Sequence, residues 1–197
     1  MFLRPKHYAL IALLTLAGFF FGVWLSQFKE EPDLAGLQSV EALLPDLAAQ
    51  RLTLAQVRAV LPGDLWVEAS LEGAVLTWHS DWEGDGQRWS LVAELALPVS
   101  ERQSLAAATG VKQGQPAEPL SAALAEQLGA HPVAALNVRS EFEPDVSQLV
   151  GHFGTAKLKL PLGDEEAWVY PARGLTARLQ GDSVRLLRFV APAELNP

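Results

Sequence analysis

An uncharged run of 21 residues, from residue 8 to residue 28, constrains this chain more than any other feature. A helix of this length rises about 30 Å, which matches the hydrocarbon thickness of a bilayer. Arg4 and Lys6 precede the run, and basic residues favour the inner side of a membrane. The run therefore predicts a transmembrane helix over residues 8–28, preceded by a cytoplasmic tail over residues 1–7.

A cleaved signal peptide is the alternative interpretation of the same run. The apolar region of a signal peptide spans about 7–15 residues and ends at a small-x-small cleavage pattern. The run is longer than this, and its exit, residues 23–27, lacks the pattern. Retention as a single-pass anchor is favoured, which predicts an inner-membrane location with the C-terminal domain in the periplasm.

Charge and cysteine content narrow the class of function. The formal net charge is −8, and residues 29–143 hold 7 basic and 17 acidic residues. A surface of this kind repels phosphate backbones, so nucleic acid is excluded as a partner. The chain has no cysteine, which excludes disulfides, thiolate metal sites and a lipid anchor on cysteine.

Beyond the apolar run, short helices alternate with short strands, which predicts an α+β fold of helices and antiparallel meanders. Residues 29–52 are expected to form a linker with short helices, and residues 53–197 to form the exported domain. A capped helix followed by a meander occurs at 53–97 and again at 144–190, which suggests two units in tandem. The expected strands are 65–70, 74–79, 88–97, 133–142, 157–160, 167–170, 175–180 and 184–190, with helices at 101–109 and 120–128 between the two units.

Residues 153–190 contain a helix-ending Gly154, a strand with Trp168 and Tyr170, and a turn at Gly181. This succession resembles the second half of the BamE-like (SmpA/OmlA) family, small envelope domains of the β-barrel assembly machinery. The tandem helix-and-meander unit is also similar to β-lactamase-inhibitor-like folds. The resemblance implies an envelope domain of that architecture. It does not imply membership of the assembly complex, because those lipoproteins carry a lipidated cysteine that this chain lacks.

An acidic segment at residues 81–86 is the best metal-binding candidate in the chain. Its carboxylates Asp81, Glu83 and Asp85 are arranged like the first ligands of a calcium loop. The twelfth position of such a loop would be Val92, where a bidentate Glu is required. A solvated acidic turn is therefore the favoured interpretation, and no metal or other cofactor is predicted.

The histidines and carboxylates form no pattern that is typical of a catalytic site. None of the four histidines lies in a recognisable metal-binding or catalytic spacing, and the chain has no G-x-S-x-G nucleophile elbow. Glu165 and Glu166 are adjacent, so on a strand their side chains point to opposite faces. No catalytic residue is predicted.

Aromatic and basic side chains supply the candidates for binding a partner. The strands at 175–180 and 184–190 end the fold, so one of them is expected to be a sheet edge with unpaired backbone groups. Their arginines would attract an acidic partner; the alternative is a solvated sheet face with its charges outward. The predicted binding residues are Arg178, Arg185, Arg188, Trp168 and Tyr170, together with Trp82, the tryptophan expected to be exposed.

These observations favour a membrane-anchored interaction or scaffold module of the bacterial cell envelope, without catalytic activity and with an envelope protein as its partner. Two alternatives stay open: an envelope enzyme with an unrecognised active site, and a domain that senses a small ligand or a metal. Exposed aromatic side chains on a flat surface would indicate a partner site. A pocket that holds His79 or His152 beside a carboxylate would indicate catalysis.

Overall fold

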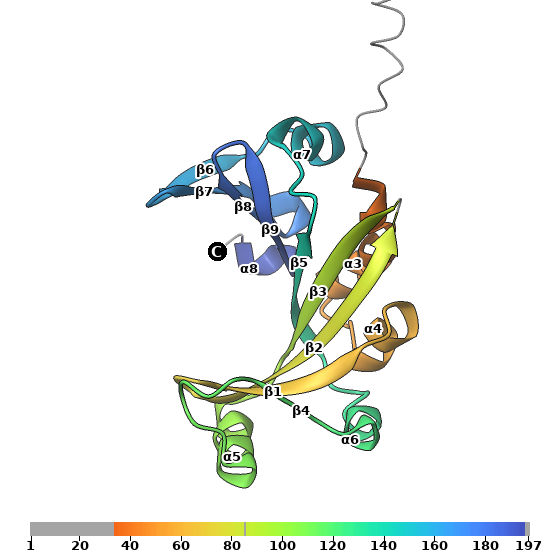
Figure 1. Ribbon diagram of the computed structural model, residues 1–197, viewed down its shortest axis with the longest axis vertical. Coiled ribbons are helices and arrows are strands. Elements are labelled where there is room, and N and C mark those ends of the chain that lie inside the picture. Colours follow the sequence, from red (N-terminus) through yellow and green to blue (C-terminus); the bar gives the residue numbers. More distant parts are fainter. Residues whose placement is uncertain (1–33, 85, 196–197) are drawn as a thin grey trace, which may run out of the picture. The chain divides into compact units, whose positions relative to one another are not determined.

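Nine strands form one continuous sheet in the computed structural model, which describes residues 34–84 and 86–195. The strands are β1 (Asp64–Ser70), β2 (Gly73–Gly84), β3 (Gln87–Leu95), β4 (Glu118–Pro119), β5 (Val133–Ser140), β6 (Leu158–Leu162), β7 (Glu165–Tyr170), β8 (Leu175–Gln180) and β9 (Ser183–Val190). Their spatial order is β4-β1-β2-β3-β5-β9-β8-β7-β6, and every neighbouring pair is antiparallel. The sheet twists strongly between β1 and β6 (Figure 1).

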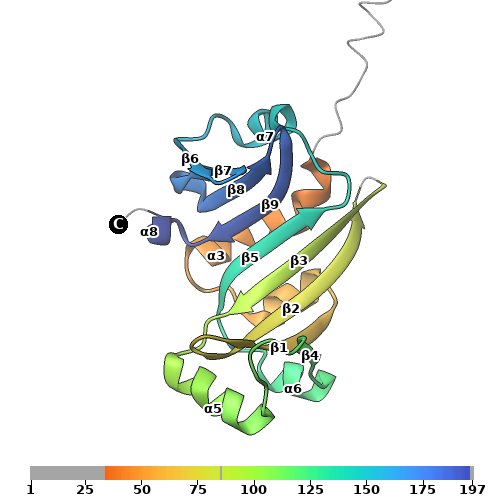
Figure 2. The same ribbon diagram turned by 60° about the vertical axis from the view of Figure 1, so that its left-hand side comes forward.

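Short helices cover one face of this sheet and border the other. They are η1 (Leu34–Leu37), α2 (Gln38–Glu41), α3 (Leu44–Ala48), α4 (Leu54–Val60), α5 (Val99–Thr109), α6 (Ala122–Gln127), α7 (Val146–Phe153), η2 (Pro171–Arg173) and α8 (Pro192–Leu195). On the covered face, Trp78 donates a hydrogen bond to the Leu61 carbonyl, which follows α4, and Trp82 donates one to the Gly36 carbonyl in η1. We call the opposite side the open face. In Figure 2 the central strands lie in front of α3 and α4.

The alternation of side chains along β3 explains why the sheet has two unlike faces. Trp89, Leu91, Ala93 and Leu95 are buried, and the residues between them are half-buried. Successive side chains of a strand point to opposite sides, so the buried set packs beneath the helices. The same alternation recurs in β8, where Leu175, Ala177 and Leu179 are buried.

Two helices begin at the capping residues that the sequence indicates. Thr53 caps α4 and accepts from the Gln56 backbone, and the Gln56 side chain accepts from the Thr53 backbone in return. Asp145 and Gln148 form the same reciprocal arrangement at the start of α7. Each cap satisfies backbone N–H groups that the first helical turn leaves free.

Residues 34–52, expected to be a linker with short helices, contribute fully to the core. Six of their side chains are buried against the sheet: Leu34, Leu37, Val40, Leu43, Leu47 and Leu52. Gly36 makes the close approach possible, because a Cβ at this position would lie 1.9 Å from Nε1 of Trp89. Gly84 adds to it, since its own Cβ would meet the Gly36 Cα at 2.7 Å.

The expected fold class was wrong in two respects: the relative share of helices and strands, and the grouping of the strands into separate meanders. Helices were expected to share the fold with separate meanders, whereas one nine-stranded sheet dominates the structure. The expected strands occur close to the predicted positions, but β5 pairs with β9 and joins the first group of strands to the last. This pairing continues the core across both groups: Leu136 of β5 lies opposite Phe189 of β9, and both are buried.

The predicted single-pass topology and inner-membrane location are also corrected. Within residues 34–84 and 86–195, no helix is both long and apolar enough to cross a bilayer. The segment expected to span the membrane, residues 8–28, lies outside the described residues, as does the cytoplasmic tail over residues 1–7.

Candidate functional site

Three exposed leucines on the edge strand β6 form the most unusual surface of the sheet. Leu158, Leu160 and Leu162 are 51%, 48% and 48% exposed. They occupy alternate positions of one strand, so their side chains lie on the same face. We call these three residues the leucine stripe. Apolar side chains that are exposed next to one another often mark a surface that another molecule covers.

The sheet has its edge at β6, which corrects the expectation that one of the last two strands is an edge. Neither β8 nor β9 is an edge: β9 lies between β5 and β8, and β8 lies between β9 and β7. The edges are β4 and β6. The final hairpin is paired with β7 along residues 175–179 and with β5 along residues 187–190, so over these stretches its backbone groups are not free to bind a partner strand.

Arg178 lies on the same face as the leucine stripe. Leu160 is opposite Ala167 of β7, and Ala167 is opposite Arg178 of β8. Ala167 is small and buried, and it is the one β7 residue between Leu160 and the exposed arginine in this register. Within the described part of the chain, Arg178 has no ion-pair partner. A free cation thus borders the leucine stripe.

Arg188, by contrast, is held in a network on the open face. Its guanidinium donates to both carboxylate oxygens of Glu94, at 2.7 and 3.0 Å, and to Oδ1 of Asn137 at 2.9 Å. Asn137 in turn donates to Glu94 at 2.7 Å. The hydrogen bond from Arg188 is the main cause that lowers the pKa of Glu94, and the same contact raises the pKa of Arg188. This predicted binding residue joins β9 to β3.

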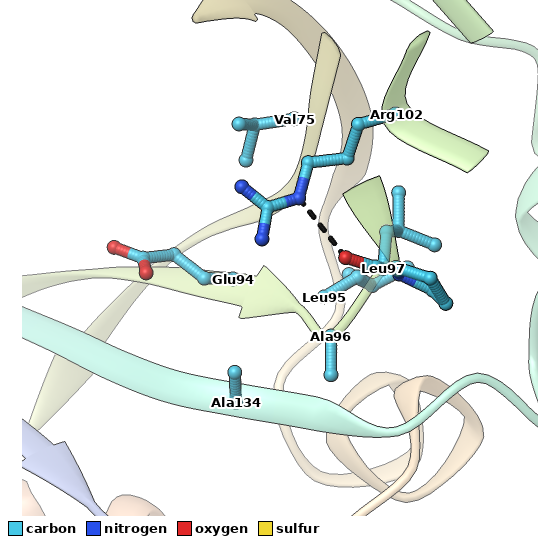
Figure 3. Close-up of a pocket in the computed structure, with 8 residues that line it drawn as sticks. Val75, Glu94, Leu95, Ala96, Leu97, Arg102 and Ala134 are labelled. Carbon is cyan, nitrogen blue, oxygen red and sulfur yellow. Dashed lines mark hydrogen bonds between the residues drawn. The ribbon is translucent and has the colours of Figure 1, made fainter. Parts of the chain in front are cut away.

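A pocket of about 450 Å³ adjoins this network at the end of β3. Figure 3 shows Arg102 of α5 above the end of the strand and the Glu94 carboxylate to one side. Arg102 donates to the Leu97 carbonyl and to Glu72, each at 2.9 Å. Both charged side chains therefore have partners within the fold. The pocket is lined by Val75, Glu94, Leu95, Ala96, Leu97, Pro98, Arg102 and Ala134.

The other predicted partner-binding residues do not join Arg178 in one patch. Arg185 forms an ion pair with Glu143. Trp168 and Tyr170 are buried on the covered face, where Trp168 donates to Glu166 at 2.8 Å and has the Lys159 ammonium 3.4 Å from its ring centroid. Their alternation with Ala167 and Val169 along β7 explains why they face away from Arg178.

Trp82, expected to be exposed, is half-buried on the covered face. Its ring stacks on Trp89 with the centroids 6.2 Å apart, and its Nε1 donates to the Gly36 carbonyl at 3.0 Å. The remaining tryptophans of this region are a buried Trp78 and a half-buried Trp66, whose ring centroid lies 5.5 Å from that of His79. Trp78, Trp82 and Trp89 pack between the sheet and its helices, whereas Trp66 lies on the other face beside His79, so these rings form no exposed aromatic patch.

The acidic segment contains the predicted turn, but the turn is shorter than expected: Gly86 lies in a turn before β3, whereas residues 81–84 belong to β2. β2 continues to Gly84, and Asp81 and Glu83 are exposed on alternate positions opposite Ser90 and Arg88. Asp85 lies outside the described residues. In the described part of the chain, no group of three or more His, Asp or Glu side chains is placed to hold a metal ion.

Two histidines lie beside possible hydrogen-bond partners. Nε2 of His152 is 2.6 Å from a Glu41 carboxylate oxygen, a contact that joins α7 to α2. Nε2 of His79 is 2.9 Å from the Thr77 hydroxyl, and burial is the main cause that lowers the pKa of His79. Neither histidine lines the pocket beside Glu94.

The leucine stripe was not predicted, although its signal is present in the sequence as L-K-L-P-L at residues 158–162. Alternating leucines predict a strand with one apolar face, but the pattern does not say whether a helix covers that face. Comparison with known proteins does not supply a template, since no family model, curated protein or solved structure matches the chain. The resemblance of residues 153–190 to the BamE-like family therefore stays a prediction.

Proposed function

We propose that this chain is a non-catalytic interaction module that binds a partner protein on the open face, over the leucine stripe and Arg178. The observation that carries the proposal is the exposure of about half of each leucine in the stripe. Burying a leucine side chain fully is worth about 1.5–3 kcal/mol. Covering the exposed halves of all three would therefore contribute about 2–4 kcal/mol, or roughly 30- to 1,000-fold in Kd.

Backbone pairing along β6 is disfavoured as the binding mode. Pro161 has no N–H to donate, and Lys159 lies beside it on the edge strand. Proline and lysine on an edge strand both oppose the addition of a further strand. The partner is therefore expected to place apolar side chains across the leucine stripe, and its backbone is not expected to extend the sheet.

The exposed arginines near the leucine stripe indicate which charge the partner should carry at the edge of its binding surface. Arg178 is exposed beside the stripe and lacks an ion pair among the described residues. Arg139 of β5 is exposed on the same face, two strands beyond Arg178. A partner with apolar anchors and an acidic rim complements this arrangement, since rim charges set the rate and specificity of association.

Site-specific photocrosslinking tests the proposal in cells that make the full chain. A benzophenone amino acid at position 160 should give a discrete adduct with one protein. The matched control places the same amino acid at position 71, because Leu71 is 92% exposed but lies on the turn between β1 and β2. Arg178→Glu should reduce the adduct at position 160, and in extracts of the same cells this reduction should be larger at low salt.

Two outcomes would contradict the proposal. One is an adduct profile at position 160 identical to that at position 71, which would indicate nonspecific contact of any exposed leucine. The other is the absence of a discrete adduct at all three stripe positions in a chain whose urea unfolding matches that of the unlabelled protein.

A further inference from the structure

A second pocket, of about 270 Å³, lies between the end of α7 and the end of β7. Phe153 is the last residue of α7, Tyr170 is the last residue of β7, and η2 follows Tyr170 directly. This pocket shares no residue with the leucine stripe or with the pocket beside Glu94. We call it the Tyr170 pocket; it is lined by Phe153, Thr155, Lys157, Tyr170, Pro171, Ala172 and Arg173.

The charged side chains that line the Tyr170 pocket are both basic. Lys157 and Arg173 are exposed, and neither has an ion-pair partner in the part of the chain that the structure describes. The Arg173 guanidinium carbon lies 5.7 Å from the centroid of the Phe153 ring. A guanidinium that lies over an aromatic ring can still donate two parallel hydrogen bonds in its own plane, which suits a carboxylate.

Tyr170 adds a donor that the fold does not use. The residue is only 5% exposed, and its hydroxyl has no hydrogen-bond partner among the described residues. A buried tyrosine hydroxyl usually has a partner, because an unpaired one costs free energy. Burial raises the pKa of Tyr170, so the hydroxyl stays protonated at neutral pH and acts as a donor. Thr155 supplies another hydroxyl to the lining.

We propose that the Tyr170 pocket binds a small organic carboxylate, with the carboxylate on Arg173 and Lys157, the Tyr170 hydroxyl as a third donor, and the apolar body against Phe153. Size supports a small acid. A water molecule takes up about 30 Å³ of the liquid, so the pocket volume corresponds to about nine water molecules. Benzoate, a planar acid with an apolar ring, is a probe of suitable size and chemistry.

The test is an NMR titration of the full chain with benzoate, with its neutral isostere benzamide as the matched ligand. Benzoate should cause saturable shifts confined to residues 153–157 and 170–173, and benzamide should not. Arg173→Gln should weaken benzoate binding at least tenfold, and Tyr170→Phe should weaken it severalfold. Arg178→Gln, which removes an unpaired arginine on the open face, should leave the affinity unchanged.

Several results would overturn the assignment. Equal binding of benzamide would mean that the pocket recognises apolar shape alone. Equal losses in Arg173→Gln and Arg178→Gln would mean that benzoate responds to net charge and not to this pocket. Unchanged affinity in Tyr170→Phe would remove the hydroxyl from the site, and inorganic phosphate that binds where benzoate does not would replace a carboxylate by a phosphate ligand. Failure of the partner crosslink at position 160 would leave this proposal standing, because the two sites share no residue.

Discussion

Replacing Arg188 by methionine should destabilise the fold through Glu94. The substitution keeps an unbranched apolar side chain but removes both hydrogen bonds from the guanidinium to the Glu94 carboxylate, at 2.7 and 3.0 Å. Asn137 still donates to Glu94 at 2.7 Å, so the carboxylate is left with one partner on the open face. The expected result is a less stable protein whose native sheet is otherwise unchanged.

The size of the stability loss follows from how exposed the Arg188–Glu94 ion pair is. The side chains of Arg188 and Glu94 are 40% and 32% exposed, between a surface pair and a buried one. Exposed pairs contribute about 0.2–1 kcal/mol, whereas removing one partner of a fully buried pair costs about 3–5 kcal/mol. We therefore expect Arg188→Met to lower the free energy of unfolding by about 1–2 kcal/mol. Because the free energy of unfolding falls by about 1–3 kcal/mol per molar urea, the unfolding midpoint should fall by about 0.3–2 M.

Urea unfolding followed by tryptophan fluorescence measures this, since Trp78 and Trp89 are buried in the native state. The pH dependence supplies a second readout. Folding lowers the pKa of Glu94 below its ordinary 4.5, so the stabilisation is complete above pH 4.5 and is lost as the pH falls through the lower folded-state pKa. The difference between the wild type and Arg188→Met should therefore be constant above pH 4.5 and shrink below it.

Arg178→Met is the matched control, because it removes an arginine from the same face that has no ion-pair partner among the described residues. It should change the stability by no more than about 0.5 kcal/mol. Equal effects of the two substitutions would refute the role assigned to the Glu94 network. A difference between the wild type and Arg188→Met that persists unchanged at pH 3 would refute the assignment to Glu94.

Three further changes test other parts of the fold. Gly36→Ala should lower the free energy of unfolding by about 1–3 kcal/mol, because the new Cβ would meet the buried Trp89 ring; a thermal melt as high as that of the wild type would contradict this packing. Tyr170→Phe should raise the stability by about 1 kcal/mol in urea unfolding, because it removes a buried hydroxyl without a partner, and a loss of stability would show that the hydroxyl is bonded. Burial lowers the pKa of His79 below its ordinary 6.5, so the protein should be most stable above pH 6.5, where His79 is neutral, and lose stability as the pH falls below 6.5. His79→Gln should remove this part of the pH dependence of stability, and thermal melts at pH 5 and pH 7.5 measure it.

Local patterns predicted the strands well, but not the order in which they pair. The alternation that places β3 at residues 87–95 is contained in a stretch of nine residues, and so is the capping box at Thr53. The pairing of β5 with β9 joins positions about fifty residues apart, such as Asn137 with Arg188, and no local signal specifies it. That pairing makes the final hairpin interior and leaves β6 at the edge, so the prediction of an edge at β8 or β9 failed for a long-range reason.

The acidic segment shows a local signal that was overruled in part. Asp, Glu and Gly between residues 81 and 86 are typical of a turn, and Gly86 does lie in one, but β2 continues through Glu83 to Gly84 before that turn. The cross-strand stack of Trp82 on Trp89 lies within this extension and is anchored further by the hydrogen bond from Trp82 to Gly36. Contacts with a segment nearly fifty residues earlier thus hold an acidic, glycine-rich stretch in the sheet.

Ion pairing separates the arginines of the last strands into two groups that their sequence positions do not distinguish. Arg185 and Arg188 are engaged by Glu143 and Glu94, both of which precede them by more than forty residues. Arg173 and Arg178 have no ion-pair partner among the described residues, and they lie in the Tyr170 pocket and beside the leucine stripe. In a chain with a formal net charge of −8, an anionic group is repelled over long distances and gains only where a cation is unengaged. Arg173 and Arg178 are therefore the arginines of this region where binding of an anion should be sought, and substituting each one should affect its own site and leave the other unchanged.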